Sequence, residues 1–387
     1  MKISNHILQH LVCLAIIGFI AITTHAQQEL WGGAKGSPVI HLDGSVTFNL
    51  KAPQAHQVKL KLDFNNDTTL KCDADDTWSI TTPPLAANLY RYNFIIDGVK
   101  TLDPENVYTM RDVSTLMNYF FVNGKESALY QVQDTPHGTV QAVWYDSPSL
   151  GTKRRMMVYT PAGYDESNRH YPVLYLLHGS GGDETAWLEQ GRAAQVMDNL
   201  IAQERALPMI VVMPNGNVDE QAAPGSTAAG LTPPSFAHKQ WMEGSFESSF
   251  GDIVNYVEQH YRVQNGASHH AIAGLSMGGY HALYISANNP NDYGYVGLFS
   301  AAITPRKGVK ADIYENLEQK LAQQFGLLKG LYWIGIGKDD FLQKDNQRFI
   351  SLLKQKHYPF TYRESDGGHE WRNWRLYLTE FVPLLFK

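Results

Sequence analysis

The sequence predicts two domains of different fold class, a β-sandwich followed by an α/β domain with a largely parallel sheet. In the first third of the chain, segments such as residues 45–50, 58–62 and 90–94 alternate apolar with polar residues, the period of half-buried antiparallel strands. Further along, longer apolar runs alternate with amphipathic helical stretches, a pattern typical of parallel strands covered by helices on both faces. The length of 387 residues agrees with two domains.

The amino-acid composition excludes several classes of protein and several kinds of partner and binding site. Hydrophobic residues make up 43% of the chain and charged residues 18%, which excludes fibrous and disordered proteins. Lys and Arg number 32 against 38 Asp and Glu, and no basic block stands out, so we expect no nucleic-acid or membrane partner. Two cysteines exclude a disulfide framework and a Cys-rich zinc site. No His, Asp or Glu spacing indicates a metal centre, and we expect neither a metal nor a cofactor.

Residues 1–26 predict a cleaved secretory signal peptide. Lys2 supplies a positive start, an apolar run covers residues 11–22, and the small residue Ala26 precedes the expected cleavage site. The run is short for a permanent membrane anchor, and Cys13 lies inside it rather than after it, which argues against lipid attachment. We therefore expect the mature protein to be exported, either secreted or periplasmic.

Residues 27–122 carry the pattern of many short strands, which favours an immunoglobulin-like β-sandwich. The strongest local signal is Asp97 and Gly98, which stand between two alternating segments and predict a tight hairpin. Residues 123–137 are loop-like and predict a linker between the domains.

Residues 138–387 form the predicted α/β domain. Its buried strands are expected at residues 172–177, 209–213, 271–274 and 331–336. Its helices are expected at residues 191–205, 250–261, 277–288 and 343–357.

The strongest chemical signal is the run GLSMGG at residues 274–279, which follows an apolar strand and precedes a helical pattern. A serine on such a sharp strand-to-helix turn is a nucleophile whose hydroxyl is presented at the end of the sheet. Glycine is needed on both sides because a Cβ at position 274 or 278 would collide with the neighbouring strand or helix. The sequence therefore predicts Ser276 as the nucleophile.

A serine hydroxyl needs a base, and in domains with this turn the acid and the histidine follow the serine along the chain. Of the histidines beyond Ser276, His281 lies on the departing helix and His357 at a helix end, whereas His369 lies in a glycine-rich loop after a strand. We predict His369 as the general base. The acid is expected after residues 331–336, where spacing does not choose between Asp339 and Asp340, and the other aspartate is expected to cap the following helix.

The last element of the predicted active site is the run LHGSGG at residues 177–182, where a strand ends and a glycine-rich loop begins. This is where one donor of an oxyanion hole is placed, and the second is the amide of Met277, directly after the nucleophile. His178 is predicted to hold the loop rather than a metal.

With these motifs in place, residues 138–387 resemble carbohydrate esterase family 1, the esterase-D-like branch of the α/β-hydrolases. The resemblance rests on VYTP at residues 158–161, YPVLYLLHG at 171–179, GLSMGG at 274–279 and GHEW at 368–371. It implies Asp340 as the acid and the amides of Ser180 and Met277 as the oxyanion donors. The preceding region is similar to a carbohydrate-binding module of family 48, on the residues DGSVTF at 43–48, YRY at 90–92 and DP at 103–104.

Such a pairing implies a secreted serine esterase that acts on plant cell-wall polysaccharide, most simply on feruloyl esters of xylan. Three alternatives stay open: an acetyl-xylan esterase, a siderophore esterase, and a carbohydrate-binding protein with an inactive hydrolase domain. If the N-terminal module binds sugar, the aromatic residues Trp31, Trp78, Tyr90 and Tyr92 are candidates, although core packing is favoured for each. As a tethered binding domain, the module is expected to matter for polymeric substrates and little for small esters.

Overall fold

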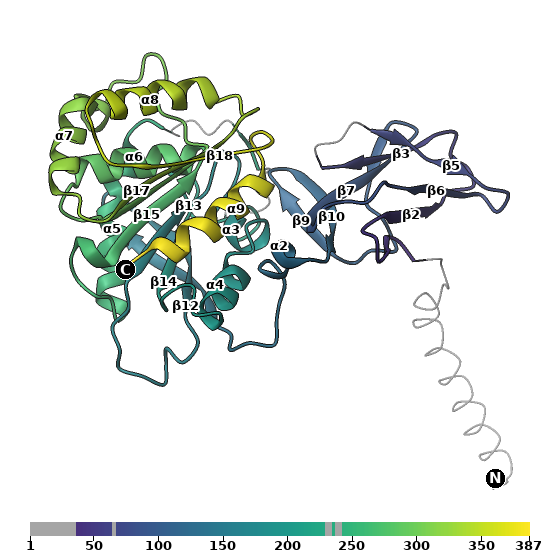
Figure 1. The fold of residues 1–387 in the computed structure, drawn as a ribbon, viewed down its shortest axis with the longest axis horizontal. Coiled ribbons are helices and arrows are strands. Elements are labelled where there is room, and N and C mark those ends of the chain that lie inside the picture. Colours follow the sequence, from purple (N-terminus) through teal and green to yellow (C-terminus); the bar gives the residue numbers. More distant parts are fainter. Residues whose placement is uncertain (1–35, 64–66, 229–233, 237–241) are drawn as a thin grey trace, which may run out of the picture.

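The computed structural model describes residues 36–63, 67–228, 234–236 and 242–387 of the chain. The predicted signal peptide, residues 1–26, and Trp31 lie outside these ranges. Figure 1 shows two lobes, a smaller β-rich domain and a larger α/β domain. Over the described ranges, no helix combines the length and the apolar character needed to cross a membrane.

The N-terminal domain is built from two sheets that enclose one apolar core. The four-stranded sheet has the order β1-β2-β6-β5, and the larger sheet has the order β4-β3-β7-β10-β9, with β8 paired to β7. The strands are β1 (Val39–Ile40), β2 (Val46–Lys51), β3 (Val58–Leu62), β4 (Thr68–Thr69), β5 (Lys71–Cys72), β6 (Thr77–Thr81), β7 (Asn88–Ile96), β8 (Val99–Thr101), β9 (Thr109–Asp112) and β10 (Thr115–Val122). The predicted β-rich domain is present; its immunoglobulin-like topology stays a prediction.

Local turn chemistry and core packing follow the sequence pattern. Asp97 and Gly98 join β7 to β8 with φ values of 46° and 88°, the left-handed conformations that a tight hairpin requires. Trp78 and Tyr92 are buried, and the ring of Tyr90 stacks on that of Phe120. The core interpretation of these three candidate rings is confirmed, and a sugar-binding role for them is not supported.

The C-terminal domain contains an eight-stranded sheet of order β11-β12-β14-β13-β15-β16-β17-β18, in which all pairings from β14 to β18 are parallel. Its strands are β11 (Thr139–Ser147), β12 (Thr152–Thr160), β13 (Val173–Leu177), β14 (Ile210–Pro214), β15 (His270–Leu275), β16 (Tyr295–Phe299), β17 (Leu331–Gly337) and β18 (Thr361–Ser365). The two N-terminal strands pair antiparallel and are partly exposed, so they lack the continuous apolar runs that predict buried parallel strands.

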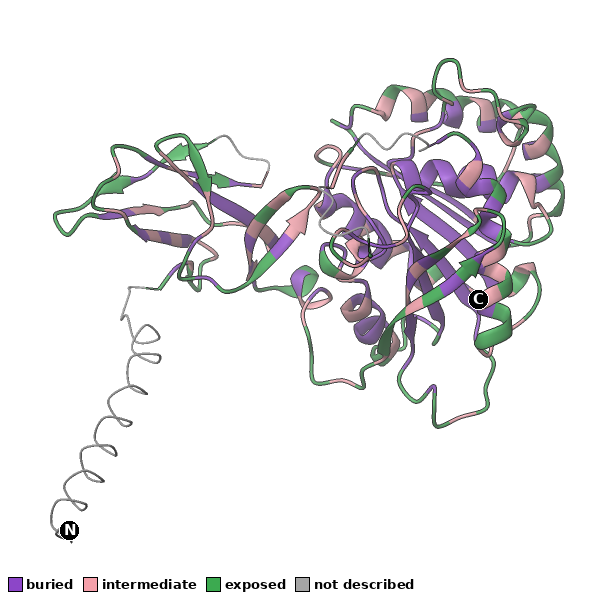
Figure 2. Cartoon of the chain, turned by 180° about the vertical axis from the view of Figure 1, so that it is seen from behind, coloured by how far each residue is buried: buried purple, intermediate pink, exposed green. Residues whose placement is uncertain are grey.

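Helices cover both faces of this sheet. They are α3 (Ala186–Glu189), α4 (Ala193–Ala202), α5 (Ser245–His260), α6 (Met277–Asn288), α7 (Leu317–Leu327), α8 (Gln343–Gln355) and α9 (Trp371–Phe381), with 3-10 turns η2 (Ala267–His269), η3 (Asp312–Tyr314) and η4 (Val382–Leu384). One core cluster packs α5 to α8 on one face, and a second packs α3, α4 and α9 on the other. The central strands are therefore buried on both sides, as Figure 2 shows, and this confirms the predicted α/β class.

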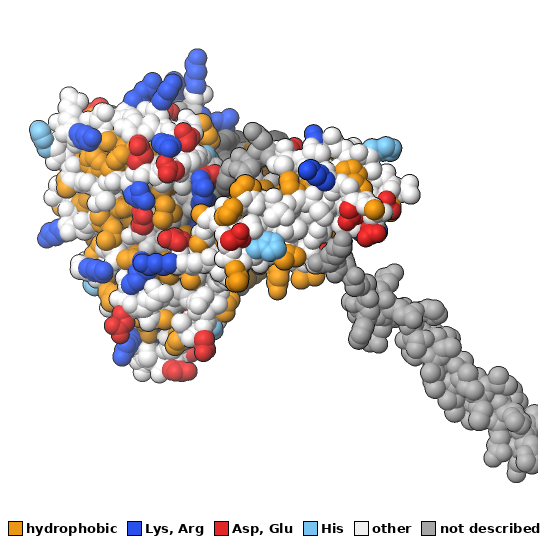
Figure 3. Space-filling view, turned by 45° about the vertical axis from the view of Figure 1, so that its right-hand side comes forward, with side chains coloured by type: hydrophobic (Ala, Val, Ile, Leu, Met, Phe, Trp, Pro, Cys, Tyr) orange, Lys and Arg blue, Asp and Glu red, His pale blue; other side chains and the backbone are white. Residues whose placement is uncertain are grey.

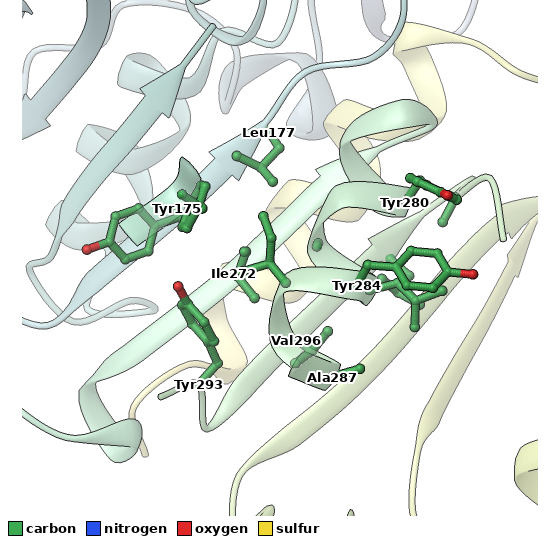
Figure 4. Packing of buried hydrophobic residues seen from close by; sticks show 14 of the residues in the cluster. Tyr175, Leu177, Ile272, Tyr280, Tyr284, Ala287, Tyr293 and Val296 are labelled. Carbon is green, nitrogen blue, oxygen red and sulfur yellow. The ribbon is translucent and has the colours of Figure 1, made fainter. Parts of the chain in front are cut away.

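Tyrosines fill much of the first core cluster. Figure 4 shows Tyr280 and Tyr284 of α6 packing near Ile272 of β15 and Val296 of β16. The ring centroids of Tyr280 and Tyr284 lie 4.6 Å apart, and the hydroxyl of Tyr284 donates to the carbonyl of Ile303 at 3.0 Å. A buried phenol needs such a partner, and this contact fixes α6, the helix that follows the predicted nucleophile.

The segment between the domains differs from the loop-like linker that the sequence predicts. It contains the short helix α2 (Lys125–Ala128), and Tyr130 is buried in the core cluster that packs against α4 and α9. The amide of Asn199 donates to the carbonyls of Ala128, Leu129 and Gln131 at 2.9–3.2 Å. Because its ring and its backbone are both bound by the larger domain, this segment is not a flexible tether.

The two domains also contact each other directly. Arg375 of α9 is buried, and its guanidinium donates to the carbonyl of Gln190 at 2.9 Å and to the carbonyl of Leu89 in β7 at 3.0 Å. Figure 1 shows β9 and β10 lying against the part of the larger domain that holds α3. The N-terminal domain is thus packed on the α/β domain, which corrects the expectation of a tethered module.

Candidate active site

Ser276 lies on the turn between β15 and α6, with backbone angles φ 53° and ψ −114°. This left-handed conformation is strained for a residue with a side chain, and such strain is found where a reactive group must be presented. A Cβ on Gly274 would lie within 3.0 Å of the backbone of Gly278, and one on Gly278 within 3.0 Å of the carbonyls of Leu177 and His178. The predicted reason for both glycines is therefore confirmed.

His369 follows β18, and its ring meets the carboxylate of Asp340, which follows β17. Nδ1 of His369 lies 2.9 Å from Oδ2 and 3.1 Å from Oδ1 of Asp340. The Asp340 side chain is fully shielded from solvent, whereas the His369 side chain is 17% exposed. A buried carboxylate at this distance holds the proton on Nδ1 and leaves Nε2 free to act as a base.

The structure separates the two candidate aspartates. The side chain of Asp339 is exposed, and only Asp340 reaches His369. Asp340 also accepts from the amide of Leu342 at 2.9 Å, just before α8. The expectation that the other aspartate caps this helix is therefore wrong, because one carboxylate makes both contacts.

The other two histidines that follow Ser276 along the chain, His281 and His357, lie away from the nucleophile. His281 is buried and its Nδ1 lies 2.8 Å from Oε1 of Glu247, to which the hydroxyl of Tyr314 also donates. His357 ends the segment after α8 with a positive φ of 56°. Neither of them lines the cleft that contains Ser276 and His369.

Residues 178–183, here called the oxyanion loop, leave β13 beside the start of α6. His178 is fully buried, and burial lowers its pKa to about 4, so its ring is neutral. Nδ1 donates to the carbonyl of Gly179 at 2.8 Å, and Nε2 accepts from the amide of Gly216 at 2.7 Å. These contacts use both ring nitrogens, which confirms that His178 holds the loop.

Ser180 and Met277, the residues predicted to supply the two oxyanion amides, contact each other through their side chains. The hydroxyl of Ser180 lies 3.9 Å from Sδ of Met277, so the loop and the first turn of α6 are in contact. Met277 is the first residue of α6, and its N–H therefore has no acceptor within the helix. An amide pair of this kind can stabilise the negative charge that develops on a carbonyl oxygen during acyl transfer.

A cleft of about 630 Å³ contains Ser276, His369 and Ser180. Aromatic side chains line it beside the histidine: Phe341 is 75% exposed with its ring centroid 4.5 Å from that of His369, and the indole of Trp374 lies at 4.9 Å. Phe236, 63% exposed, lines another part of the wall.

Three lining residues, Arg91, Asp112 and Val113, come from the N-terminal domain. Sequence reasoning missed them, because no local pattern indicates that a strand turn of one domain reaches the cleft of another.

Over the described ranges, no three His, Cys, Asp or Glu side chains gather as a metal site would require. Figure 3 shows Lys and Arg interspersed with Asp and Glu over the larger domain.

Comparison with known proteins places this arrangement in a family. The model of the Esterase family, described as putative esterase, matches residues 147–385. An endo-1,4-beta-xylanase/feruloyl esterase of Xylanibacter ruminicola is 28% identical over 364 residues, which cover 90% of this chain and 46% of the relative. The chain thus spans less than half the length of that relative, and the match extends well beyond the α/β domain.

Solved structures agree. A CE1 ferulic acid esterase from Anaeromyces mucronatus superposes with a TM-score of 0.56 at 27% identity, covering 67% of this chain and 95% of that one. The enterobactin esterase from Shigella flexneri, 18% identical, superposes with a TM-score of 0.64 over 88% of this chain and 92% of its own, and so shares the fold of both domains. The chain belongs to the Esterase family and is a carboxylic ester hydrolase of the serine-hydrolase type, similar to the CE1 esterases.

Proposed function

We propose that this esterase hydrolyses feruloyl esters on xylan of plant cell walls, after export directed by residues 1–26. Ser276 is the nucleophile, His369 the general base and Asp340 the residue that orients it, with the amides of Ser180 and Met277 as the oxyanion donors. The observation that carries the choice of acyl group is the cleft of about 630 Å³ beside Ser276, with its aromatic lining.

The size and lining of the cleft favour a large aromatic acyl group. Its volume lies within the range of about 300–1,000 Å³ that is typical of sites for small organic molecules. An acetyl group, with two carbon atoms, would leave most of this space unfilled. A phenyl ring on an unsaturated acyl chain can instead stack on Phe341 or meet the indole edge of Trp374, and aromatic pairs add to the free energy of burial.

The chemistry follows from the contacts of the three side chains. Oγ of Ser276 attacks the ester carbonyl while Nε2 of His369 takes its proton, and the Asp340 carboxylate stabilises the imidazolium that forms. His369 then returns the proton to the leaving sugar hydroxyl, which gives an acyl-enzyme on Ser276. Water, deprotonated by the same His369, attacks the acyl-enzyme, and His369 returns this proton to Oγ of Ser276 as the acid is released.

Two similarities to known proteins support xylan as the polymeric substrate. The Xylanibacter ruminicola relative is named a xylanase and feruloyl esterase, and the similar solved structures include ferulic acid esterases. A carbohydrate-binding role for the N-terminal domain is part of the proposal, but the rings that would serve it are not Trp78 or Tyr92. Tyr108, 62% exposed with its ring 5.8 Å from that of Tyr119, is the better candidate for stacking on sugar.

The test is to incubate the protein with one arabinoxylan that carries both ferulate and acetate, and to measure both acids. We expect ferulate to be released faster, and Ser276→Ala to lose hydrolysis by several orders of magnitude while it keeps the wild-type unfolding temperature. Faster release of acetate would make the protein an acetyl-xylan esterase. Release of neither acid, with hydrolysis of small esters intact, would contradict the polysaccharide substrate.

A further inference from the structure

The turn between β9 and β10 of the N-terminal domain reaches the oxyanion loop. Val113 in this turn lines the same cleft as Ser180 and Ser276. A Cβ placed on Gly181 would lie 2.7 Å from Cγ2 of Val113 and 3.0 Å from the ring of Phe236, so these side chains pack directly on the backbone of the loop.

Val113 adopts a positive φ of 52°. For a β-branched side chain this conformation is a genuine outlier, and it persists only where surrounding contacts determine it. The contacts come from Arg111 in β9, whose Nη1 donates to the carbonyl of Val113 at 2.9 Å.

The same guanidinium forms an ion pair through Nη2 with Oδ2 of Asp183, at the end of the oxyanion loop. Asp183 is buried, and its Oδ1 accepts from the amide and the hydroxyl of Thr185 at 2.9 and 2.7 Å. Although burial alone would raise the pKa of Asp183, the charge of Arg111 and the bonds from Thr185 lower it, so this carboxylate is ionised and paired. Arg111 thus joins the strained turn of one domain to the oxyanion loop of the other.

A second set of contacts fixes the hairpin in this position. Nε2 of Gln190 donates to the carbonyl of Arg111 at 3.0 Å, and Oε1 of Gln190 accepts from Arg91. Arg91 is itself held by Asp63 at 2.8 Å and by Asp112 at 2.9 Å. All of these groups except Asp112 are largely shielded from solvent, and β9 is therefore anchored at the two residues that end it, Arg111 and Asp112.

The loop needs such support. It contains Gly179, Gly181 and Gly182 and no regular secondary structure, so its backbone is intrinsically free to move. From inside the domain it is held by His178 and by Asn217, whose amide donates to the carbonyl of Gly182 at 2.9 Å. An oxyanion donor works only when it lies about 2.7–3.1 Å from the developing charge, and displacement by about 1 Å can lower the rate 100-fold.

We propose that the β9–β10 hairpin is a clamp on the oxyanion loop, with Arg111 and Val113 as positioning residues for ester hydrolysis. The inference rests on the catalytic roles proposed above for Ser276 and Ser180. It makes the N-terminal domain a part of the catalytic machinery for every ester, including those too small to touch it.

The experiment measures kcat and KM of the full chain on 4-nitrophenyl acetate and on methyl ferulate for Arg111→Gln, Arg111→Lys and Val113→Gly. The oxyanion is common to both esters, so we expect kcat to fall about 10- to 100-fold on both, with KM changed less than about threefold. Arg111→Lys keeps the charge and is expected to recover part of the loss. Inhibition by phenylboronic acid, which forms a tetrahedral adduct with a serine, should weaken by a similar factor, while binding of ferulate stays unchanged.

Arg192→Gln is the matched control. Arg192 lies in the same domain junction, where it donates to the carbonyl of Tyr130 at 2.9 Å and lies over the ring of Phe121, but it contacts neither Asp183 nor Gly181. We expect its kcat on both esters to equal that of the wild type. An equal loss in this variant would mean a general effect of the junction and would overturn the clamp.

The other possible outcomes also decide whether the hairpin is a clamp. Unchanged kcat in Arg111→Gln and Val113→Gly overturns the clamp, and so does a loss confined to methyl ferulate, which would make the turn only a wall of the acyl site. If Arg111→Gln does not fold, Val113→Gly carries the test, because glycine adopts a positive φ freely. If Ser276→Ala retains activity, the catalytic assignment itself fails. If Ser276→Ala is inactive but the variants of Arg111 and Val113 keep full activity, only the clamp is contradicted.

Discussion

The carboxylate of Asp340 lies 2.9 Å from Nδ1 of His369, while the preceding residue, Asp339, points its side chain to solvent. This contrast gives a comparison of two adjacent mutations. Asp340→Asn replaces the acceptor by an amide that favours the wrong tautomer of His369, and we expect kcat to fall about 10⁴-fold. Asp339→Asn should change kcat less than about twofold. Steady-state kinetics of both variants on methyl ferulate is the measurement, and the reverse order of losses would show that the acid is misassigned.

Gly278 is the position in the turn where a side chain should do most harm. A methyl group there would meet the carbonyls of Leu177 and His178, and we expect Gly278→Ala to lower the free energy of unfolding by about 2–3 kcal/mol and to displace Ser276. The control is Gly251→Ala in α5, where nothing lies within 4 Å of the new methyl group. That change should raise stability by about 0.5–1 kcal/mol. Urea unfolding of both variants tests the pair, and equal stability would contradict the steric account.

Phe341 offers its ring to the cleft, 75% exposed and 4.5 Å from that of His369. If it stacks on the acyl group, Phe341→Ala should lower kcat/KM on methyl ferulate about tenfold and leave 4-nitrophenyl acetate within about twofold. Tyr108→Ala removes another exposed ring, outside the cleft, and should affect neither ester. Equal losses on the two esters in Phe341→Ala would mean that the ring supports His369 instead of selecting the acyl group.

His178 makes stability depend on pH. Burial lowers its pKa to about 4 in the folded chain, against about 6.5 when unfolded, so between these values the unfolded chain binds the extra proton. The stabilisation is complete above pH 6.5 and is lost as the pH falls toward 4, with a slope of about 1.4 kcal/mol per pH unit from this group. His178→Gln should lack this part of the slope. Unfolding free energies of both proteins from pH 4 to pH 8 are the measurement, and parallel curves would show that His178 does not contribute.

The catalytic side chains could be predicted because each follows a strand of one parallel sheet. Strands of such a sheet end at one edge, so Ser276 after β15, Asp340 after β17 and His369 after β18 necessarily converge. The choice between Asp339 and Asp340 was different in kind, because it depends on which of two adjacent side chains turns inward. Spacing could not decide it; only the family resemblance did, and the structure places Asp340 where the resemblance implies.

The junction of the domains could not be predicted. Arg111 and Asp183 are 72 positions apart, and their contact follows from how one domain docks on the other rather than from any local pattern. The same reason explains the linker: residues 123–137 are polar and carry Pro136, as a loop would, yet Tyr130 finds a buried site on α4 and α9. Strands β11 and β12 could not be predicted in the same way, because partly exposed antiparallel strands at the edge of a sheet carry no continuous apolar run.

Arg375 has a consequence for how the protein denatures. Arg375 is 2% exposed, and its guanidinium donates both to the carbonyl of Gln190 in its own domain and to that of Leu89 in the N-terminal domain. Separating the domains would break the bond to Leu89 and leave its carbonyl and one donor group of the guanidinium without a partner, so unfolding of one domain ahead of the other is costly. Heating should therefore give one calorimetric transition rather than two, and loss of esterase activity and loss of the β-domain should share a single midpoint.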